Sequence, residues 1–277
     1  MSELVLVDET LWVWNQSTGI PIYDYDFRSS FPCRVPWDRP DEVTAIGRVG
    51  AFGDYDNIYA DLLLENIRLI HTPEQHRRAS ELSGWYPRIE GMTPRSQVYA
   101  VPPTAEEVAD SFAFPLFLKG SRQTSRHRKS LSIVTSVNEL KKALRAYAHD
   151  PILGWQPLVV RKFVPLRLVE DPFDDRIPSS FEFRTLWWQG SLVGAGPYWW
   201  EGKRYDWNPT ERQQGLALAE QAARCVDVPF LVIDLAMTVQ GDWTIMECND
   251  AQESGYAGVS AMGLWQAVLD RLPRDRR

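Results

Sequence analysis

The chain has 277 residues, of which 44% are hydrophobic and 24% are charged, and its formal net charge is −7. This composition is that of an ordinary globular protein, and the length suits two or three packed subdomains. No apolar run approaches the roughly eighteen residues of a membrane helix, which excludes a spanning segment. A pI near 5.2 argues against a protein that neutralises many nucleic-acid phosphates.

The amino-terminal stretch MSELVLVDETLW contains acidic residues and lacks a basic n-region, so we predict a first strand over residues 3–14 and no signal peptide. The three cysteines, Cys33, Cys225 and Cys248, are odd in number and widely spaced. They indicate a reducing compartment without a disulfide framework, and we expect a cytoplasmic protein. Cys248 should point into the core, because a buried free cysteine is more often structural than nucleophilic.

Residues 1–100 predict a mixed αβ domain. Apolar residues have helical spacing over residues 56–70. In the following HTPEQHRRASELS, Thr72 and Gln75 have the spacing of a capping box, which predicts a helix over residues 73–83. A short strand and a linker lead to the end of this domain.

Residues 101–165 predict a second unit, which begins with a helix capped by Thr104 and continues with the strand FPLFLKG at 114–120. A basic loop, a returning strand (SLSIVTS, residues 130–136) and a periodic helix follow. The loop contains no acid, and its basic residues are Lys119, Arg122, Arg126, Arg128 and Lys129. Such a loop is often merely solvated, but the acidic pI favours contact with the few phosphates of a small ligand over nucleic acid.

Residues 166–277 predict a third, α+β unit. The segment FEFRTLWWQGSLVGAGPYWW has the pattern of a hairpin about a Gln189–Gly190 turn, and a helix begins at Pro209. Two apolar runs within residues 230–256, FLVIDLAMTVQGDWTIMECNDAQESGY, then predict a pair of strands.

This strand pair contains a candidate metal site. Asp234 lies on the first strand, and Glu247 and Asn249 lie two residues apart on the second, so all three can share one face of a sheet. Carboxylate and amide oxygens suit magnesium, with manganese as an alternative. The short E-x-N pattern is by itself more often a pair of solvated strand residues.

Other charged residues of the predicted strands could bind a nucleotide. Lys119, at a strand end beside the basic loop, can hold phosphates as a point charge. Arg161 and Lys162 precede apolar Phe163 and Val164 in LVVRKFVPL, which could form a hinge whose backbone contacts an adenine.

Glu182 and Arg184 should share one strand face, so that Arg184 is available to neutralise a transferred phosphoryl group. The alternatives are an exposed strand face at Arg161 and Lys162, and a weak surface ion pair between Glu182 and Arg184.

Together, in this order and on strands, these motifs resemble the ATP-grasp superfamily of carboxylate–amine ligases over about residues 66–265. The resemblance rests on FPLFLKG with its loop, LVVRKFVPLR, the FEFR strand and the D-x12-E-x-N pattern that ends at Asn249. More narrowly, the chain is similar to the clade named for one arginine and two lysines. The resemblance implies an ATP-grasp fold of mixed α/β and α+β character, in which an N-terminal αβ domain (1–100) precedes two α+β subdomains (101–165 and 166–277) that clamp the nucleotide.

The resemblance also implies a reaction and a role for each residue. ATP would phosphorylate a carboxylate, and an amine would attack the acylphosphate to form an amide, with release of ADP and phosphate. Lys119 would contact the α- and β-phosphates, Lys162 the adenine and an α-phosphate oxygen, and the backbone of Phe163 and Val164 the adenine edge. Either Glu170 or Glu182 would bind the ribose, and Arg184 would bind the γ-phosphate or the acylphosphate. Asp234, Glu247 and Asn249 would hold two magnesium ions.

Some choices stay open. No lysine precedes Lys119, so Arg78 or Arg95 would replace a nucleotide-binding lysine that many members of the superfamily have. Ser254 and Gly255 follow the metal strand and are candidates for a substrate loop. We expect a small-molecule, amino-acid or peptide substrate, no membrane contact, RNA as an unfavoured partner, and a monomer or homodimer. A kinase-like phosphotransferase and a non-catalytic nucleotide-binding module are the alternatives.

Overall fold

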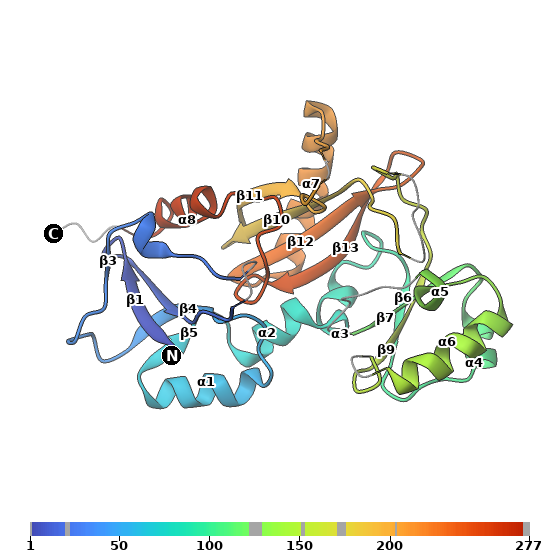
Figure 1. The fold of residues 1–277 in the computed structure, drawn as a ribbon, viewed down its shortest axis with the longest axis horizontal. Helices are drawn as coiled ribbons and strands as arrows, with labels where there is room; N and C mark the ends of the chain where they lie inside the picture. Colours follow the sequence, from blue (N-terminus) through green and yellow to red (C-terminus); the bar gives the residue numbers. More distant parts are fainter. Residues whose placement is uncertain are drawn as a thin grey trace.

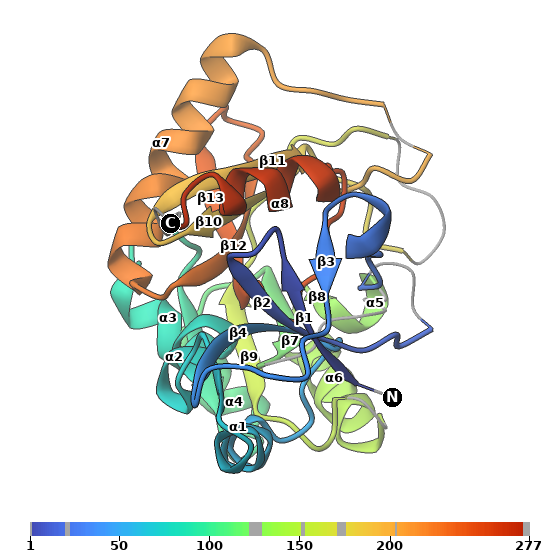
Figure 2. The ribbon, with the colours of Figure 1, turned by 90° about the vertical axis from the view of Figure 1, so that its left-hand side faces the viewer.

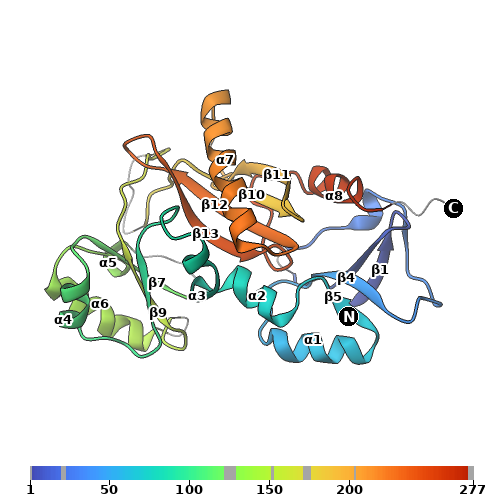
Figure 3. The same cartoon turned by 180° about the vertical axis from the view of Figure 1, so that it is seen from behind.

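The computed structural model describes residues 2–19, 23–121, 129–150, 153–170, 176–202 and 204–273. Three sheets follow one another along the molecule (Figure 1). We call them the N-terminal sheet (strands within residues 3–69), the large sheet (strands within residues 182–250) and the small sheet (strands within residues 96–162). The large sheet lies between the other two. The view from behind shows helix α7 (Pro209–Val226) crossing the large sheet (Figure 3). Within the described ranges, no helix is both long and apolar enough to cross a bilayer.

The N-terminal sheet has the strand order β3-β1-β2-β4-β5 and faces the viewer in Figure 2. Strands β2, β4 and β5 are parallel, whereas β1 pairs antiparallel with both β2 and β3. The elements of this part are β1 (Glu3–Val7), β2 (Leu11–Asn15), η1 (Phe27–Ser29), β3 (Cys33–Arg34), β4 (Val43–Arg48), α1 (Tyr55–Leu64) and β5 (Ile67–Leu69).

Two predictions for this region are wrong. The single strand expected over residues 3–14 is a hairpin, because Asp8 and Glu9 adopt left-handed backbone with φ of 49° and 60°. The helix expected over residues 56–70 ends at Leu64, and the chain continues through Asn66, with φ of 58°, into strand β5. In both places residues with positive φ turn the chain, and the apolar spacing does not reveal them.

The helix predicted after Thr72 is confirmed with its capping box. Gln75 N donates to Thr72 Oγ1, and Thr72 N donates to Gln75 Oε1. Helix α2 (Pro73–Ser80) is shorter than predicted, because Glu81 has an extended backbone. Two short helical turns, α3 (Leu82–Trp85) and η2 (Tyr86–Arg88), then carry the chain from the N-terminal sheet toward the small sheet.

The small sheet has the order β6-β9-β7-β8, with every pairing antiparallel. Its elements are β6 (Ser96–Tyr99), α4 (Ala105–Ser111), β7 (Leu116–Gly120), α5 (Lys129–Ser132), β8 (Ile133–Val134), α6 (Val137–His149) and β9 (Leu158–Lys162). The strand predicted over residues 130–136 is wrong in its first half, which is helical turn α5. Only Ile133 and Val134 pair with β7, at the edge of the sheet.

The large sheet is antiparallel, with the order β11-β10-β12-β13. Its strands are β10 (Glu182–Trp188), β11 (Ser191–Pro197), β12 (Phe230–Met237) and β13 (Trp243–Asp250), and helix α8 (Ala261–Leu269) follows. The predicted hairpin turn is confirmed, with φ of 46° at Gln189 and 76° at Gly190. Positive φ at both central residues is the geometry that suits the right-handed twist of paired strands.

The two faces of the large sheet are buried differently. One face packs on α7, where Phe183, Ile233 and Cys248 are fully buried, so the expectation that Cys248 points into the core is confirmed. On the other face, Val232 and Phe230 pack with the N-terminal sheet and α8. The predicted metal residues lie on this second face, beyond that core and toward the small sheet.

Candidate active site

Lys119 of the small sheet and Glu247 of the large sheet form an ion pair, with 2.6 Å between Lys119 Nζ and Glu247 Oε1. In β7 the side chains of Leu116 and Leu118 enter the core of the small subdomain, so alternation turns Lys119 to the opposite face. The lysine is 5% exposed. The pair therefore brings the predicted phosphate lysine directly onto the predicted metal strand.

Arg184 and Asp234 form a second buried pair beside the first. They lie opposite each other on β10 and β12, and the contact is bidentate, with Nε–Oδ1 at 2.9 Å and Nη2–Oδ2 at 2.7 Å. Arg184 Nη1 donates to the Gly255 carbonyl at 2.8 Å, and the guanidinium lies 5.0 Å from the ring centroid of Tyr198. These contacts hold the guanidinium in a single orientation.

Burial disfavours the charged form of each of these residues, and the partner in each pair favours it. Burial lowers the pKa of Lys119, although Glu247 counteracts the shift. Burial raises the pKa of Glu247, but Lys119 outweighs it, so that pKa lies below its ordinary value. For Arg184, burial acts against the charge and Asp234 more than compensates, which raises its pKa. For Asp234, burial raises the pKa, although Arg184 counteracts the shift.

Glu182 differs from the carboxylates in these pairs. It is buried on the same strand face as Arg184, and burial, reinforced by the charge of Asp234, raises its pKa to about 8. Glu182 Oε2 accepts from Ser180 Oγ at 3.0 Å and from Trp199 Nε1 at 3.2 Å. The surface ion pair between Glu182 and Arg184, which was the alternative interpretation of this strand, is not formed, since Arg184 binds Asp234. A largely protonated carboxyl group thus lies next to the charged pairs.

The three predicted metal ligands share one face of the large sheet. Asp234 lies opposite Glu247, and Asn249, opposite Val232, follows two residues later on β13. Among the residues that the structure describes, no group of three or more His, Cys, Asp or Glu side chains could hold a metal. Two carboxylates and an amide nevertheless fit magnesium, which needs only one or two carboxylates when phosphates complete its coordination.

Arg161 has a structural set of contacts. Its Nε donates to Ser96 Oγ at 2.8 Å, and its Nη1 donates to the Met246 carbonyl at 2.7 Å. The guanidinium lies 5.7 Å from the ring centroid of Trp85, and burial lowers its pKa to about 10. Arg161 therefore ties the small sheet to β13 next to Glu247, and its buried Nη2 has no hydrogen-bond partner in the part of the chain that the structure describes.

Lys162 and the hinge residues lie at the end of β9. Lys162 is exposed and lies opposite Leu116 in the β7–β9 pair. The Leu116 side chain enters the core of the small subdomain, so Lys162 lies on that face of the sheet and Lys119 on the other. Phe163 N donates to the Pro115 carbonyl at 3.2 Å. Phe163 and Val164 are half-buried, and the chain beyond them runs beside the end of β12. The structure does not bring Lys162 to the charged pairs.

The remaining predicted residues are more distant. Glu170 accepts from Ser179 Oγ. Arg78 pairs with Glu74 and donates to the Asp227 carbonyl at the end of α7, whereas Arg95 lies over the ring of Phe112. Neither arginine contacts Lys119 or Arg184 in these interactions. The loop residues Arg122, Arg126 and Arg128 lie outside the described ranges.

The predicted substrate loop is built into the site. Ser254 Oγ donates to the Asp250 carbonyl at 2.7 Å, so this hydroxyl closes its own turn. Arg48 of the N-terminal sheet donates through Nη1 to three carbonyls of the loop, those of Ala251, Gln252 and Ser254. With the bond from Arg184 to Gly255, the loop is held at both ends.

Sequence reasoning missed Tyr198 and Trp199 as neighbours of Arg184 and Glu182. Tyr198 N donates to the Glu182 carbonyl at 2.9 Å, which continues the β10–β11 ladder past Pro197. The sequence indicates this neighbourhood, because PYWW directly follows the second strand of the predicted hairpin. In an antiparallel hairpin these aromatic residues lie opposite FEFR on the first strand. Trp187 and Trp188 are core residues, and Trp200 is exposed.

Comparison with known proteins identifies the fold. A family model described as an ATP-grasp domain, family 3 of the clade named for one arginine and two lysines, matches residues 84–268. No curated protein matches the chain significantly.

Solved structures share the architecture at low sequence identity. A D-alanine–D-alanine ligase from Bacillus anthracis, complexed with ATP, has a TM-score of 0.57 at 14% identity, over 82% of this chain and 77% of that one. A RimK domain ATP-grasp protein from Sphaerobacter thermophilus has a TM-score of 0.52 at 16% identity, over 76% and 73%.

A third structure is that of N5-carboxyaminoimidazole synthase from Aspergillus clavatus, in complex with ADP and 5-aminoimidazole ribonucleotide. It has a TM-score of 0.54 at 12% identity, and the match covers 84% of this chain but only 61% of that longer protein. Likeness at these identities concerns the fold and not the reaction. Since the family model covers more than half of the sequence and the fold agrees, the chain belongs to the ATP-grasp proteins of the clade named for one arginine and two lysines.

Proposed function

We propose that the protein is an ATP-dependent ligase that joins a carboxylate to an amine through an acylphosphate and releases ADP and phosphate. The observation that supports this best is the adjacency of the Lys119–Glu247 and Arg184–Asp234 pairs. Two cations that suit phosphates and two carboxylates that suit magnesium are buried together. Binding of a magnesium nucleotide would exchange the partners of Lys119 and Glu247, with Lys119 turning to phosphate and Glu247 to the metal. Arg184 would add a phosphate contact, and Asp234 a metal contact, to the contact between them.

In this proposal Lys119 and Arg184 are the catalytic residues. Lys119 would bind the α- and β-phosphates as a point charge. Arg184, whose guanidinium is already oriented by Asp234 and the Gly255 carbonyl, would stabilise the charge on the transferred phosphoryl group. Asp234, Glu247 and Asn249 would hold magnesium, which supplies Lewis acidity and a template at the phosphates.

The nucleoside would lie toward the hinge. We propose that the backbone of Phe163 and Val164 contacts the adenine, with Arg161 and Lys162 at its edge. Of the two candidates for the ribose, Glu170 is favoured because it follows the hinge, whereas Glu182 shares a strand face with Arg184 at the phosphate end. A protonated Glu182 beside Asp234 could donate a hydrogen bond to a phosphate or acyl oxygen.

The acceptor would approach the loop that contains Ser254 and Gly255, because this loop adjoins Arg184. An amino acid or a peptide is the expected substrate class. The test is mass spectrometry of the nucleotide products over a panel of amino acids and peptides. We expect ADP and phosphate to form only when a carboxylate is present. Release of AMP, or turnover that is independent of every carboxylate, would contradict the proposal.

Omitting the amine separates a ligase from a kinase-like phosphotransferase. A ligase would stall or slowly hydrolyse its acylphosphate, whereas a phosphotransferase would accumulate a stable phosphorylated product. Binding of ATP without any turnover over the whole panel would instead favour the nucleotide-binding module.

A further inference from the structure

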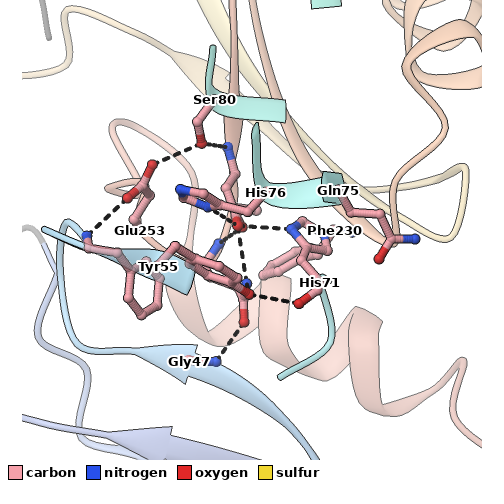
Figure 4. Close-up of polar contacts among 12 residues, drawn as sticks. Gly47, Tyr55, His71, Gln75, His76, Ser80, Phe230 and Glu253 are labelled. Carbon is pink, nitrogen blue, oxygen red and sulfur yellow. Dashed lines mark hydrogen bonds and ion pairs between the residues drawn. The ribbon is translucent and has the colours of Figure 1, made fainter. Parts of the chain in front are cut away.

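A buried polar cluster lies where β13 ends, directly after Asn249. Asp250 is 0% exposed, and its Oδ2 lies 3.0 Å from His76 Nδ1 and 2.8 Å from His71 Nδ1. His71 lies between β5 and α2, and His76 lies within α2; both are labelled in the close-up (Figure 4). The cluster lies outside the set of nucleotide and metal residues proposed above.

His71 touches the ends of both metal-bearing strands. Its Nε2 accepts the Phe230 N–H at 2.9 Å, at the first residue of β12, while its Nδ1 faces Asp250 at the last residue of β13. Because Nε2 acts as an acceptor, a neutral ring has its proton on Nδ1, next to the carboxylate. The Nδ1 contact with Asp250 is close, at 2.8 Å, but its geometry does not meet that of a hydrogen bond.

His76 is fixed by its surroundings. Its ring stacks on Tyr55, with 4.0 Å between centroids and 4° between planes. The Tyr55 hydroxyl donates to the His71 carbonyl at 2.9 Å and accepts from Gln252 Nε2 at 3.1 Å. Gln252 N also donates to Asp250 Oδ1 at 2.8 Å. The N-terminal domain thus presents two imidazoles to one carboxylate in a rigid frame.

Asp250 lies among hydrogen-bonding partners in this setting. Burial by itself raises its pKa, but His71 and His76 outweigh burial and move the pKa well below its ordinary value. Replacing a buried charged group and its partners by apolar residues of the same volume is often neutral for stability. Stability alone is therefore a weak reason for this cluster, whereas fixing the geometry of the strand ends is a strong one.

On the other side of the metal residues the β12–β13 ladder is irregular, although Arg161 and Thr93 hold the carbonyls of Met246 and Ile245. The β12–β13 register shifts between Asp234 and Leu235, so that a bulge follows the position where Asp234 lies opposite Glu247. A bulge interrupts the ladder and changes where side chains point. From Asp234 to Leu231 the ladder is regular, and it ends at Asp250, on the histidines.

We propose that His71 and His76 are positioning residues that hold the common end of β12 and β13 and thereby set the separation of Asp234, Glu247 and Asn249. This inference rests on the proposed function, because it concerns the magnesium-dependent part of ATP binding. The histidines contact neither nucleotide nor metal.

Two substitutions of His76 separate positioning from packing. His76→Phe keeps a ring that can stack on Tyr55 but removes the N–H that faces Asp250. His76→Asn keeps a donor near the place of Nδ1 but removes the ring. Isothermal titration calorimetry with a non-hydrolysable ATP analogue, in magnesium and in EDTA, measures the gain in affinity that magnesium provides.

For the wild-type protein we expect tighter binding in magnesium than in EDTA. His76→Phe should lose about 10- to 100-fold of this gain, the usual effect of removing a group that orients a metal ligand. His76→Asn should keep most of it. His149→Asn, a change at an exposed histidine at the end of α6, is the matched control and should match the wild type.

The inference would be overturned if magnesium improved the nucleotide affinity of His76→Phe as much as it does that of the wild type. It would also be overturned if His76→Asn lost more of this gain than His76→Phe. Either result would leave the proposed function intact. Absence of nucleotide binding by the wild-type protein would overturn both. Thermal unfolding shows whether each variant is folded. If His76→Phe is not folded, Asp250→Asn tests the same contact, because it removes the carboxylate charge at nearly constant size. If magnesium improved the nucleotide affinity of that variant as much as it does that of the wild type, the inference would equally be overturned.

Discussion

Lys119 Nζ lies 2.6 Å from Glu247 Oε1, so the residue proposed to bind phosphate and a residue proposed to bind metal are each other's partner. The contact joins the small and large sheets, and a bound magnesium nucleotide would replace it with contacts to both. In the proposed function, nucleotide binding therefore breaks the Lys119–Glu247 ion pair.

Replacing Lys119 by Met should destabilise the protein more than the double change Lys119→Met with Glu247→Gln. The single change leaves a buried carboxylate without its partner, a loss of about 3–5 kcal/mol when pairs are fully buried, and the double change removes that charge. Urea unfolding measures both free energies. Lys141→Met is the control, because the Lys141–Glu106 pair is exposed and worth under about 1 kcal/mol. Equal losses in the single and double variants would contradict a coupled pair.

Glu247→Gln alone should reduce turnover to background while the protein stays folded, because the amide cannot supply the negative charge that magnesium requires. ADP release and thermal unfolding report the two properties. Retained turnover in this variant would remove Glu247 from the metal site.

Arg184→Lys should lower kcat by about 10²–10³-fold, since lysine cannot keep the bidentate contact to Asp234 and also stabilise the transferred phosphoryl group. Arg167→Lys, at a partly exposed arginine paired with Glu211, should keep the wild-type rate. A change confined to KM would mean that Arg184 binds the substrate without acting on the transferred group.

The free energy of unfolding should depend on pH through Glu182. Its pKa is about 8 in the folded protein and has its ordinary value of 4.5 in the unfolded chain, so the folded protein binds more protons and stability falls as pH rises from about 4.5 to about 8. Glu182→Gln should remove this decline. Urea unfolding at pH 5, 6.5 and 8 checks it, and parallel wild-type and variant profiles would contradict it.

Lys162→Ala should weaken nucleotide binding less than Lys119→Met does, because alternation in β9 and β7 places the two lysines on opposite faces of the small sheet. Calorimetry with ATP compares the variants. A greater loss for Lys162→Ala would support the side-chain contact with adenine and α-phosphate that the family resemblance implies.

Local features of the fold were predictable from the sequence. The capping boxes at Thr72 and Thr104 and the Gln189–Gly190 turn depend on residues within a few positions of one another, and all three are confirmed. The two strands of the predicted metal site were also recognisable, because each contains a run of apolar residues. Local patterns failed where one residue with positive φ redirected the chain, as at Asp8 and Asn66.

Partners within the site were not predictable in the same way. Lys119 and Glu247 are 128 residues apart, and His76 and Asp250 are 174 apart. No spacing rule links such residues, and the face that each presents depends on how two sheets meet. Arg161 illustrates the difficulty: its sequence context does not reveal that it lies opposite Ser96 and donates to the Ser96 hydroxyl and the Met246 carbonyl.

The bond from Arg184 Nη1 to the Gly255 carbonyl has an evolutionary consequence. The loop expected to select the acceptor also seats the arginine proposed to act on the phosphoryl group, so a change in loop length would disturb the rate together with the substrate range. Homologues that adopt new acceptors should therefore keep the length of residues 250–256, with diversification concentrated in the other walls of the acceptor site.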